Sequence, residues 1–568
     1  GADDHCMLNL LLAQLVAPPL QQGPVRLPAQ ERQPLPREVS PAVPIELPAA
    51  APTEAPPAET PGSAEPGAPP LFPAPRLEGT SPYPSSAIEA ILKPCRQVAD
   101  PGERVQACAA ALTARLVLDG YINTRVYVRS TADGGELEIV EGRLVEVRVV
   151  SEDPWLQRRV QRLLAPLRGE VLRVPRIERE LQLLQQLPVV GGVRASLSRL
   201  GSDPSQGTLA VTVERARQPL QGEFSLRNDG SNGSGEARLL GTLLKPSLFK
   251  DGDILLLNGE VNTTDEPEFG SAIGSLSYTL PLGEQFNVTG AFGYSRRNLV
   301  ELEDPLDEFS TDQYQGLGQL EWVFHESLSQ RWSFTLGYTA SRGESLLDGD
   351  PLPQEVPETL REPRNGYLRL GLNGSGFGRR FGWSGTTYLL QGISPATPAD
   401  QRRELAEIDI RPGQATAWGA LVAASWALAP GWQLSASAGG QVAFQPLTDP
   451  MRFTLGSDVG LRGLPAQFVS GDSGWLGTLE LGWTFWQNPH HALQLVPFIG
   501  AGGVYTTLPA DTISDTVGSG GLLVRWQAAS AWLVEVGWVD QFATQDNRGP
   551  WSDWALGQGF YGRVQYRF

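Results

Sequence analysis

Residues 332–339 read Trp-Ser-Phe-Thr-Leu-Gly-Tyr-Thr, and this stretch decides the fold because large apolar residues alternate strictly with small or polar ones. Successive side chains of a β-strand point to opposite faces, so Trp332, Phe334, Leu336 and Tyr338 share one face. Ser, Thr and Gly occupy the other face. The stretch therefore predicts a strand with one apolar face and one small or polar face.

The same alternation recurs from Pro219 to the C-terminus, and no helical periodicity returns after that residue. Apolar segments of this kind, separated by Gly, Asp, Asn and Pro clusters, are typical of strands with lipid on one side and a polar lumen on the other. At about 20–22 residues for each strand and connection, the region accommodates about 16 strands, an even number as expected of such barrels. We therefore expect residues 218–568 to form a membrane β-barrel of about 16 antiparallel strands. Further alternating stretches lie at residues 286–294, 368–373, 532–538 and 560–568.

A soluble β-sandwich or propeller is the alternative to this barrel. A sandwich has fewer strands, and no repeat of the length of a propeller blade is visible. Some connections are long and acidic, as at residues 301–308 and 346–363, whereas others are short. Long loops at one end and short turns at the other are typical of outer-membrane barrels.

Composition excludes several classes of function. The formal net charge of −18 argues against a nucleic-acid partner, whose phosphates require a basic surface. No run of 18 apolar residues predicts a membrane-spanning helix. The acidic runs and the four histidines lack the spacing of metal ligands, and no nucleophile elbow or phosphate loop is evident. We therefore expect no enzyme activity, no cofactor and no metal.

The N-terminal segment, residues 1–74, is unlike the rest. Residues 7–16 form a short apolar run that is a signal-peptide remnant, a tag junction or a short amphipathic helix. Residues 17–75 are rich in Pro, Ala and Glu, a composition that predicts a disordered or polyproline linker.

Two small modules follow the linker, over residues 75–144 and 145–217. Each shows the order β-α-α-β-β, with alternating strands and amphipathic helices. The strands are expected at residues 76–78, 121–128 and 136–140 and at 145–150, 193–197 and 209–213, and the helices at 85–92 and 107–119 and at 155–164 and 175–186.

Two features of these modules leave alternatives open. Cys95 and Cys108 form a disulfide in an oxidising compartment, or they are two small buried thiols. The second module is rich in Arg, which either steers an acidic partner or forms solvated helix faces. The arginines concerned are Arg158, Arg159, Arg162, Arg176 and Arg179.

A long connection in the barrel region, residues 446–474, carries one Arg between glycines. We call this segment the lumenal loop and call Leu461, Arg462, Gly463 and Leu464 its tip. Arg keeps its charge at any working pH and presents five donors in a rigid fork. Such a group in a tight loop suits a buried ionic contact inside a barrel.

In this order the sequence resembles the TpsB transporters of two-partner secretion, in which two POTRA modules precede a barrel. The resemblance covers residues 75–568. It rests on residues 118–121 and 141–144 in the first module, 181–188 and 191–197 in the second, 225–231 in the first barrel strand, and 461–463 with 470–475 in the lumenal loop. Phe568 resembles the C-terminal signal that the barrel-insertion machinery reads.

The tip and its expected partner depart from the family pattern. Leu464 and Pro465 replace the usual aromatic residue after the Arg-Gly pair. The usual Phe-x-Asp-x-Gly of the partner strand reads Phe498-Ile499-Gly500-Ala501-Gly502, so Gly500 stands at the acidic position. A buried Arg without an anion is costly, and we therefore expect another partner on the barrel wall. Glu480 is our candidate; backbone carbonyls and water are the alternative.

The resemblance implies an outer-membrane pore, surrounded by lipid, that exports a partner exoprotein. The POTRA modules, in the periplasm, bind the unfolded exoprotein; the loop, and a plug formed by residues 7–16, move to open the barrel. The alternatives are a barrel-assembly factor, a passive channel with periplasmic domains, and a soluble adhesin-like β-protein. Two modules favour secretion, because relatives that assemble barrels usually carry more.

Overall fold

The computed structural model describes residues 45–46, 71–130, 135–185, 187, 189–200, 203–217, 220–264, 268–302, 307–378, 380–507, 512–528, 531–543 and 549–568. The chain divides into two compact units at Arg217 and Gln218: Val39–Arg217 form one, and Gln218–Phe568 belong to the other. Among the described residues, no helix is both long enough and apolar enough to cross a bilayer. The expected helix at residues 7–16 lies outside the described residues.

The first module has the predicted order β-α-α-β-β. Its sheet has the order β2-β4-β3, with β2 parallel and β3 antiparallel to β4. Asp100 starts α3 because its side chain accepts a hydrogen bond from the Glu103 N–H at 2.8 Å, with Pro101 at the first helical position. Strand β3 begins at Arg125, later than the predicted Tyr121, because residues 121–124 form a turn. The elements are β2 Arg76–Gly79, α2 Ser85–Leu92, α3 Pro101–Leu118, β3 Arg125–Ser130 and β4 Glu136–Val140.

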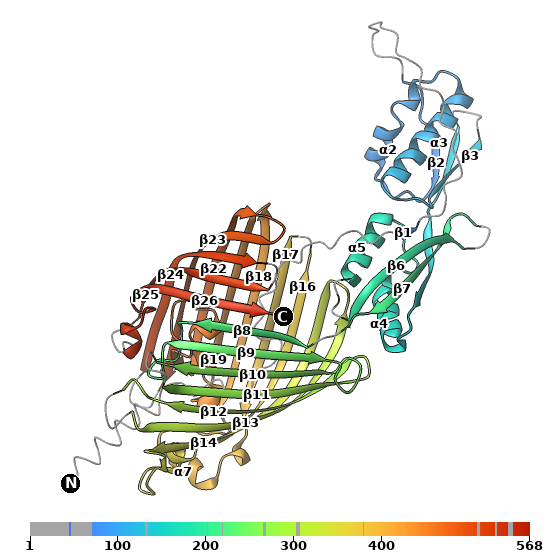
Figure 1. Ribbon diagram of the computed structural model, residues 1–568. Coiled ribbons are helices and arrows are strands. Elements are labelled where there is room, and N and C mark those ends of the chain that lie inside the picture. Colours follow the sequence, from blue (N-terminus) through green and yellow to red (C-terminus); the bar gives the residue numbers. More distant parts are fainter. Residues whose placement is uncertain are drawn as a thin grey trace. The chain divides into compact units, whose positions relative to one another are not determined.

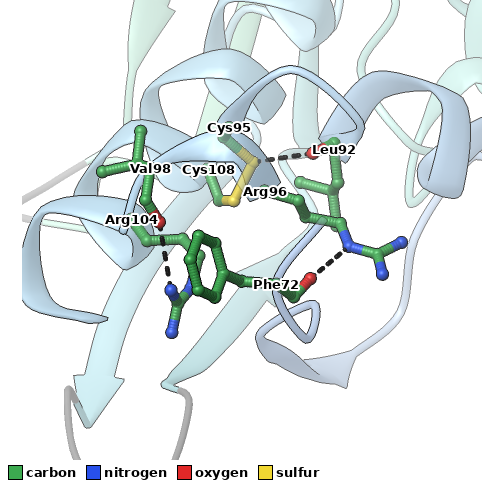
Figure 2. The surroundings of a disulfide bond; sticks show 7 residues. All are labelled: Phe72, Leu92, Cys95, Arg96, Val98, Arg104 and Cys108. Carbon is green, nitrogen blue, oxygen red and sulfur yellow. Dashed lines mark hydrogen bonds between the residues drawn. A yellow bond between two sulfur atoms is a disulfide. The ribbon is translucent and has the colours of Figure 1, made fainter. Parts of the chain in front are cut away.

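A disulfide joins the two helical segments of this module (Figure 2). Cys95 lies in the 3-10 turn Cys95–Gln97 and Cys108 lies in α3, with their Cα atoms 5.1 Å apart. Both residues are buried in a cluster with Val105 and Leu137. Of the two alternatives for this pair, the structure contains the disulfide.

The second module repeats the order and packs α4 and α5 against a sheet with the strand order β1-β6-β7-β5. Strand β7 pairs with β6 in antiparallel and with β5 in parallel orientation. The core contains Leu156, Leu181 and Leu209, each fully buried. The elements are β5 Arg143–Val150, α4 Pro154–Leu164, α5 Val174–Gln185, β6 Val190–Arg199 and β7 Gln206–Arg215.

Strand β1, Ile45–Glu46, corrects one prediction. The linker was expected to be disordered or polyproline throughout, yet these two residues pair in parallel with β6 of the second module. The physical reason is that Ile45, Glu46 and Leu47 form a short stretch free of proline between Pro44 and Pro48, so the stretch has N–H groups that can join a sheet.

The second unit contains a closed barrel of sixteen long strands among the described residues, with a short β15, Asp350–Pro351, paired to β14. The last strand, β26, pairs with the first, β8, and closes the barrel (Figure 1). The strands are β8 Gln221–Arg227, β9 Ala237–Pro246, β10 Ile254–Thr263, β11 Phe269–Leu282, β12 Phe286–Asn298, β13 Phe309–Glu326, β14 Gln330–Leu347, β16 Arg364–Phe377, β17 Phe381–Gly392, β18 Thr416–Ala429, β19 Trp432–Ala443, β22 Ser473–Gln487, β23 His491–Thr507, β24 Thr512–Ala528, β25 Trp532–Phe542 and β26 Phe560–Arg567.

The alternation that predicted the barrel sets its two faces. In β14, Phe334, Leu336 and Tyr338 are each at least 41% exposed, whereas Ser333 and Thr339 are at most 6% exposed. Apolar side chains therefore cover the outer surface, where a membrane needs them, and small polar side chains face inward.

The longest connections of the barrel, those before β16, β18, β22 and β26, all lie at the same end, and the connections at the other end are short. Although the sequence shows no helical periodicity after Pro219, two long connections contain short helices, α6, Glu358–Arg361, and α7, Ala399–Glu407. Both helices follow a proline, Pro357 and Pro398, and are too short to show a clear helical periodicity.

Candidate functional site: the tip of the lumenal loop

The lumenal loop connects β19 and β22, the eleventh and twelfth barrel strands. It leaves the barrel wall at the end with long connections, yet its tip reaches Glu480, which lies midway along β22. Leu479, next to Glu480, is 45% exposed on the outer face, so Glu480 faces the inside of the barrel. The loop therefore folds into the lumen.

A small hairpin and two left-handed glycines shape the loop. Strand β20, Phe453–Leu455, pairs with β21, Val469–Gly471, and brings the two arms of the loop together. Between them, Gly460 and Gly463 have φ of 102° and 85°, values that residues with a Cβ rarely adopt. A Cβ on Gly463 would lie 2.3 Å from Cγ1 of Val539 on β25, so this glycine also permits close approach to the wall.

Apolar side chains on both sides of Arg462 fix the tip. Leu461 and Leu464 are fully buried in a cluster with residues of the barrel wall and of the connection before β26. Burial of a leucine side chain contributes about 1.5–3 kcal/mol. Wall and connection residues in this cluster include Val496, Phe498, Val517, Leu523, Val539, Trp551, Trp554, Leu556 and Tyr561.

Arg462 itself binds two carboxylates. Its Nη2 lies 2.8 Å from Oε1 of Glu480, and its Nη1 lies 2.9 Å from Oε1 of Glu535 on β25. The Arg462 side chain is 15% exposed and that of Glu535 only 1%. A guanidinium with this little water contact depends on the two anions for its stability.

Two further arginines on the wall complete an ionic cluster. Arg525 on β24 contacts Glu535 at 2.6 Å and Glu480 at 3.4 Å. Arg563 on β26 lies 3.7 Å from the second oxygen of Glu535. The cluster thus joins β22, β24, β25 and β26 through the loop tip, with three cations around two anions.

The expected partner strand contributes packing in place of an anion. Gly500 on β23 is free of ionic contact because it has no side chain, and a Cβ there would lie 3.1 Å from Cδ2 of Leu461. The space of the usual acidic side chain is therefore occupied by Leu461. The ring of Phe498 lies 5.8 Å from Cζ of Arg462, and a Cβ on Gly502 would lie 2.8 Å from Cδ1 of Leu455.

The sequence predicted Glu480 as the substitute anion for Arg462, and the structure confirms this contact. It did not predict the other members of the cluster, which are Glu535, Arg525 and Arg563. The alternation of β25 placed Glu535 on the polar face. Alternation assigns many residues to the lumen-facing side, and it does not show which of them form ion pairs across the lumen. Glu535 could therefore not be distinguished from the others.

A second buried ion cluster holds the other side of the loop, and the sequence analysis missed it. Arg238 on β9 is 1% exposed and binds Glu260 on β10 through two hydrogen bonds, of 2.8 and 3.0 Å. Its Nη1 lies 3.8 Å from Oδ1 of Asp229 and 3.5 Å from Oγ of Ser457 in the loop. An Arg side chain that donates two parallel hydrogen bonds to one carboxylate forms a strong interaction, which also fixes the orientation of the guanidinium.

Hydrogen bonds also join the loop to both sides of the seam between β26 and β8. The Ala466 N–H donates to the Gly230 carbonyl at 2.9 Å, just after β8. On the other side, Nε2 of Gln541 on β25 donates to the Gly463 carbonyl at 2.7 Å and to the Leu556 carbonyl at 2.6 Å. The loop therefore bridges the place where the barrel closes.

Phe568, the expected insertion signal, extends this seam. Its N–H and carbonyl each pair with Gly222 at 3.0 Å. The Phe568 ring occupies the space beside Gly222, where an added Cβ would lie only 2.1 Å from Cζ of Phe568. The ring also stacks on that of Phe224, with the two ring centroids 6.0 Å apart. The ring is 49% exposed on the outer surface.

The five predicted client-binding arginines lie on α4 and α5 of the second module. Arg176 pairs with Glu170 at 2.7 Å, and the guanidinium of Arg159 lies 5.4 Å from the ring of Trp155. Arg158 and Arg179 are exposed, and Arg162 is half-buried. In the part of the chain that the structure describes, no group of three or more His, Cys, Asp or Glu residues is arranged to hold a metal.

Comparisons with known proteins agree with this architecture. The haemolysin secretion/activation protein family ShlB/FhaC/HecB matches residues 206–520. The outer membrane transporter CdiB of Dickeya dadantii (strain 3937) is 25% identical over 440 residues, which is 74% of each chain. The solved structure of CdiB from Escherichia coli superposes with a TM-score of 0.58 at 18% identity, covering 90% of this chain and 93% of its own.

CdiB from Acinetobacter baumannii superposes with a TM-score of 0.52 at 15% identity, covering 100% of this chain and 97% of its own. At these identities the two structures establish a shared fold. The sequence match over more than half of the chain shows that the protein belongs to the haemolysin secretion/activation protein family ShlB/FhaC/HecB, as an outer-membrane transporter that exports a partner exoprotein by two-partner secretion.

Proposed function

We propose that the exoprotein crosses the membrane through the lumen of the barrel and that the lumenal loop is the gate. The observation that carries this proposal is the burial of Arg462 between Glu480 and Glu535. To leave the lumen, the tip must break both ion pairs, and separating one partner from a buried pair costs about 3–5 kcal/mol. The gate therefore stays closed until another interaction offsets this cost.

The second ion cluster is the hinge side of the gate. Arg238 is held by Glu260 and reaches Ser457, near the start of the tip region. The contacts of Arg462 can break while those of Arg238 persist. The tip then swings away from β22 and β25 and remains tethered near β8 and β9.

The two modules at 75–144 and 145–217 receive the exoprotein in the periplasm while it is unfolded. A strand-forming segment adds to a free sheet edge, where backbone hydrogen bonds supply affinity without a fixed sequence. The exposed Arg158 and Arg179 attract acidic stretches of the exoprotein. Their contribution is to association rate and falls with salt.

Export needs no catalysis by this chain and no cofactor. Family membership as a transporter supports this view. The free energy for net movement comes from the exoprotein as it folds outside the cell. Because that folding buries apolar surface only on the far side, it favours movement outward.

Phe568 serves the assembly of the transporter and has no part in export. Its exposed ring and its backbone pairing with Gly222 place a hydrophobic end at the closing seam. The barrel-insertion machinery reads this end, and lipid covers it afterwards.

A deletion strain tests the transport role and identifies the exoprotein. We expect one large protein to disappear from the culture supernatant and to return on complementation with the wild-type chain. A supernatant unchanged by the deletion contradicts the proposal.

A reversible cross-link tests the gate. Leu461→Cys with Gly500→Cys places two thiols within reach, since the Leu461 side chain lies 3.1 Å from a Cβ at position 500. Oxidation should stop secretion, and reduction should restore it. The two single-cysteine variants are the controls, and full secretion by the oxidised double variant would show that the loop does not move.

A further inference from the structure

Two arginines face each other where the barrel closes. Arg227 of β8 and Arg563 of β26 are direct register partners in the antiparallel pair that joins the first barrel strand to the last. Their strand neighbours Leu226 and Val564 are 52% and 40% exposed on the outer surface, so both arginines face the lumen. Like charges directly opposite each other destabilise a strand pair. This seam is also short, with five register positions, whereas β8 pairs with β9 and β26 with β25 over seven each.

Carboxylates of the protein do not balance these two charges. Among the residues that the structure describes, Arg227 forms no ion pair, and its Nε donates a hydrogen bond to Oγ of Ser225 at 3.3 Å. Arg563 lies 3.7 Å from Glu535, whose carboxylate is closer to two other guanidiniums, at 2.9 and 2.6 Å. The ionic cluster at the loop tip already has three cations around two anions. With Arg227, four guanidiniums face two carboxylates, which is an excess of two positive charges.

Buried hydrogen-bond donors beside the two guanidiniums lack an acceptor. Gln565 is 1% exposed and stands opposite Ser225 in register, so its amide lies on the inward face next to the arginines. Its Oε1 accepts a hydrogen bond from Nη2 of Arg563, and its Nε2 therefore remains as a donor. In the described part of the chain, Nε2 of Gln565 and Nε of Arg563 are both buried without a hydrogen-bond partner. Buried donors of this kind favour a group that only accepts hydrogen bonds.

A small cavity borders Arg227 and Ser225 on the lumen side. Its volume of about 30 Å³ has room for one water molecule or one monatomic ion. Glu223 and Glu260 also line this cavity, but each pairs with another arginine at 2.8 Å. Asp229, the next carboxylate after Arg227 in sequence, lies 3.8 Å from a further arginine. The carboxylates around the cavity are therefore committed to other cations.

We propose that a small inorganic anion, with chloride as the type, binds in the lumen between Arg227, Arg563 and the amide nitrogen of Gln565. Its charge offsets the repulsion between the two guanidiniums, and it accepts the hydrogen bonds that the buried donors offer. Because its ligands come from β8 and β26, the anion joins the first barrel strand to the last. This site goes beyond the proposed function, since it concerns closure of the barrel and depends neither on the gate nor on the exoprotein.

Bromide, which replaces chloride and scatters anomalously, tests the site directly. Crystals of the purified full chain, grown without the exoprotein and soaked in bromide, should show an anomalous peak in contact with Arg227, Arg563 and Gln565. The peak should be lost in crystals of the Arg227→Gln variant. Because these crystals contain no exoprotein, the peak also separates a free anion from a carboxylate of the client.

Thermal stability in different salts tests what the anion does. The folded band of the wild type in gel electrophoresis should persist to a temperature several degrees higher in chloride than in isethionate, a bulky anion, at equal ionic strength. Arg227→Gln should abolish this shift and be more stable than the wild type in isethionate, because the repulsion is gone. A merely structural role of Arg227 predicts lower stability in both salts.

Two further variants complete the comparison. Gln565→Met removes the amide donors at similar length and should reduce the chloride shift, which keeps the test open if Arg227→Gln does not fold. Arg331→Gln removes a lumenal arginine of β14, away from the seam, and should keep the full shift. The proposal is overturned if no bromide lies between the two arginines. A chloride shift equal in the wild type, Arg227→Gln and Gln565→Met also overturns it, because any bromide found there is then an adventitious ion only.

Discussion

Nη1 of Arg462 lies 2.9 Å from Oε1 of Glu535, a carboxylate on the fifteenth barrel strand that is almost fully buried. The usual family pattern places the anion on the thirteenth strand, where this chain has Gly500. The anion has thus moved two strands along the wall, and the guanidinium contacts carboxylates on the twelfth and fifteenth strands. The ionic contact survives although its expected partner is missing.

Glu535→Gln should open the pore more than Glu480→Gln. Glu535 is approached by three guanidiniums, at 2.9, 2.6 and 3.7 Å, and Glu480 by two. Removal of the more central anion leaves more buried charge unpaired, at a cost of about 3–5 kcal/mol to the closed gate. Single-channel conductance in planar bilayers should show a higher open fraction.

Glu321→Gln is the matched control for this comparison. Glu321 pairs with Arg331 at 3.0 Å on the lumen side of β13, far in sequence from the loop, and both side chains are more exposed. Its loss should change the open fraction little, as for other exposed pairs. Equal effects of the three variants would mean that lumen charge alone sets conductance.

Restoring the usual acidic residue, Gly500→Asp, should weaken the barrel. The new Cβ lies 3.1 Å from Leu461 and 3.3 Å from Cγ2 of Thr478, so the carboxylate enters an apolar space. We expect a lower temperature for loss of the heat-modifiable folded band in gel electrophoresis. Leu461→Ala added to Gly500→Asp should recover part of the loss by making room, and a more stable single variant would refute this account.

Gly463→Ala should release the tip, whereas Gly460→Ala should act weakly. Both residues have positive φ, which costs a residue with a Cβ about 1–2 kcal/mol. At Gly463 the added Cβ also meets Val539 at 2.3 Å, but at Gly460 the nearest atom is Thr478 Cγ2 at 3.8 Å. Protease cleavage of the loop in intact cells measures the release.

The double variant Gly463→Ala/Val539→Ala tests whether contact with the barrel wall causes the difference between the two glycine variants. Val539→Ala should reduce the cleavage of the Gly463→Ala variant toward that of Gly460→Ala, because it removes the colliding methyl groups. If both glycine variants are cleaved alike, backbone conformation rather than contact with the wall determines the position of the tip.

Cys95→Ala with Cys108→Ala should destabilise the first module. The disulfide closes a loop with a sequence separation of 13, and a loop of this size contributes about 3 kcal/mol through the unfolded state. Urea-dependent proteolysis of this region in the full chain should start at lower urea. Reduction of the wild type should reproduce the shift, and an unchanged midpoint would show that the buried cluster alone suffices.

The architecture could be predicted because each strand carries its own signal. Alternation marks a strand and its lipid face without reference to any neighbour, as residues 332–339 illustrate. The sequence did not predict helix α7, because nine residues show little helical periodicity. It did not predict β1, because the proline-rich composition around residues 45–46 is typical of a linker.

The ionic clusters could be predicted only in part. Glu480 was predicted because it alternates with Leu479 and Leu481, which places its carboxylate on the inward face of a strand. Arg238 and Glu260 lie on neighbouring strands but are not direct register partners, since Arg238 stands opposite Asn262 and Glu260 opposite Leu240. Their contact depends on the directions of the two side chains. Glu535 can reach Arg462 only because the strands of the closed barrel surround the loop.

The pairing of the first barrel strand with the last has a consequence for biosynthesis. Nδ2 of Asn228 donates to the Phe560 carbonyl at 2.8 Å, a contact between residues 332 positions apart. The barrel cannot close until the ribosome has finished the chain and the whole chain has been delivered to the membrane. Contacts of such long range form slowly. The unclosed strands must therefore be shielded from one another during transit, and a truncation of even the final strand leaves a polypeptide with two open edges.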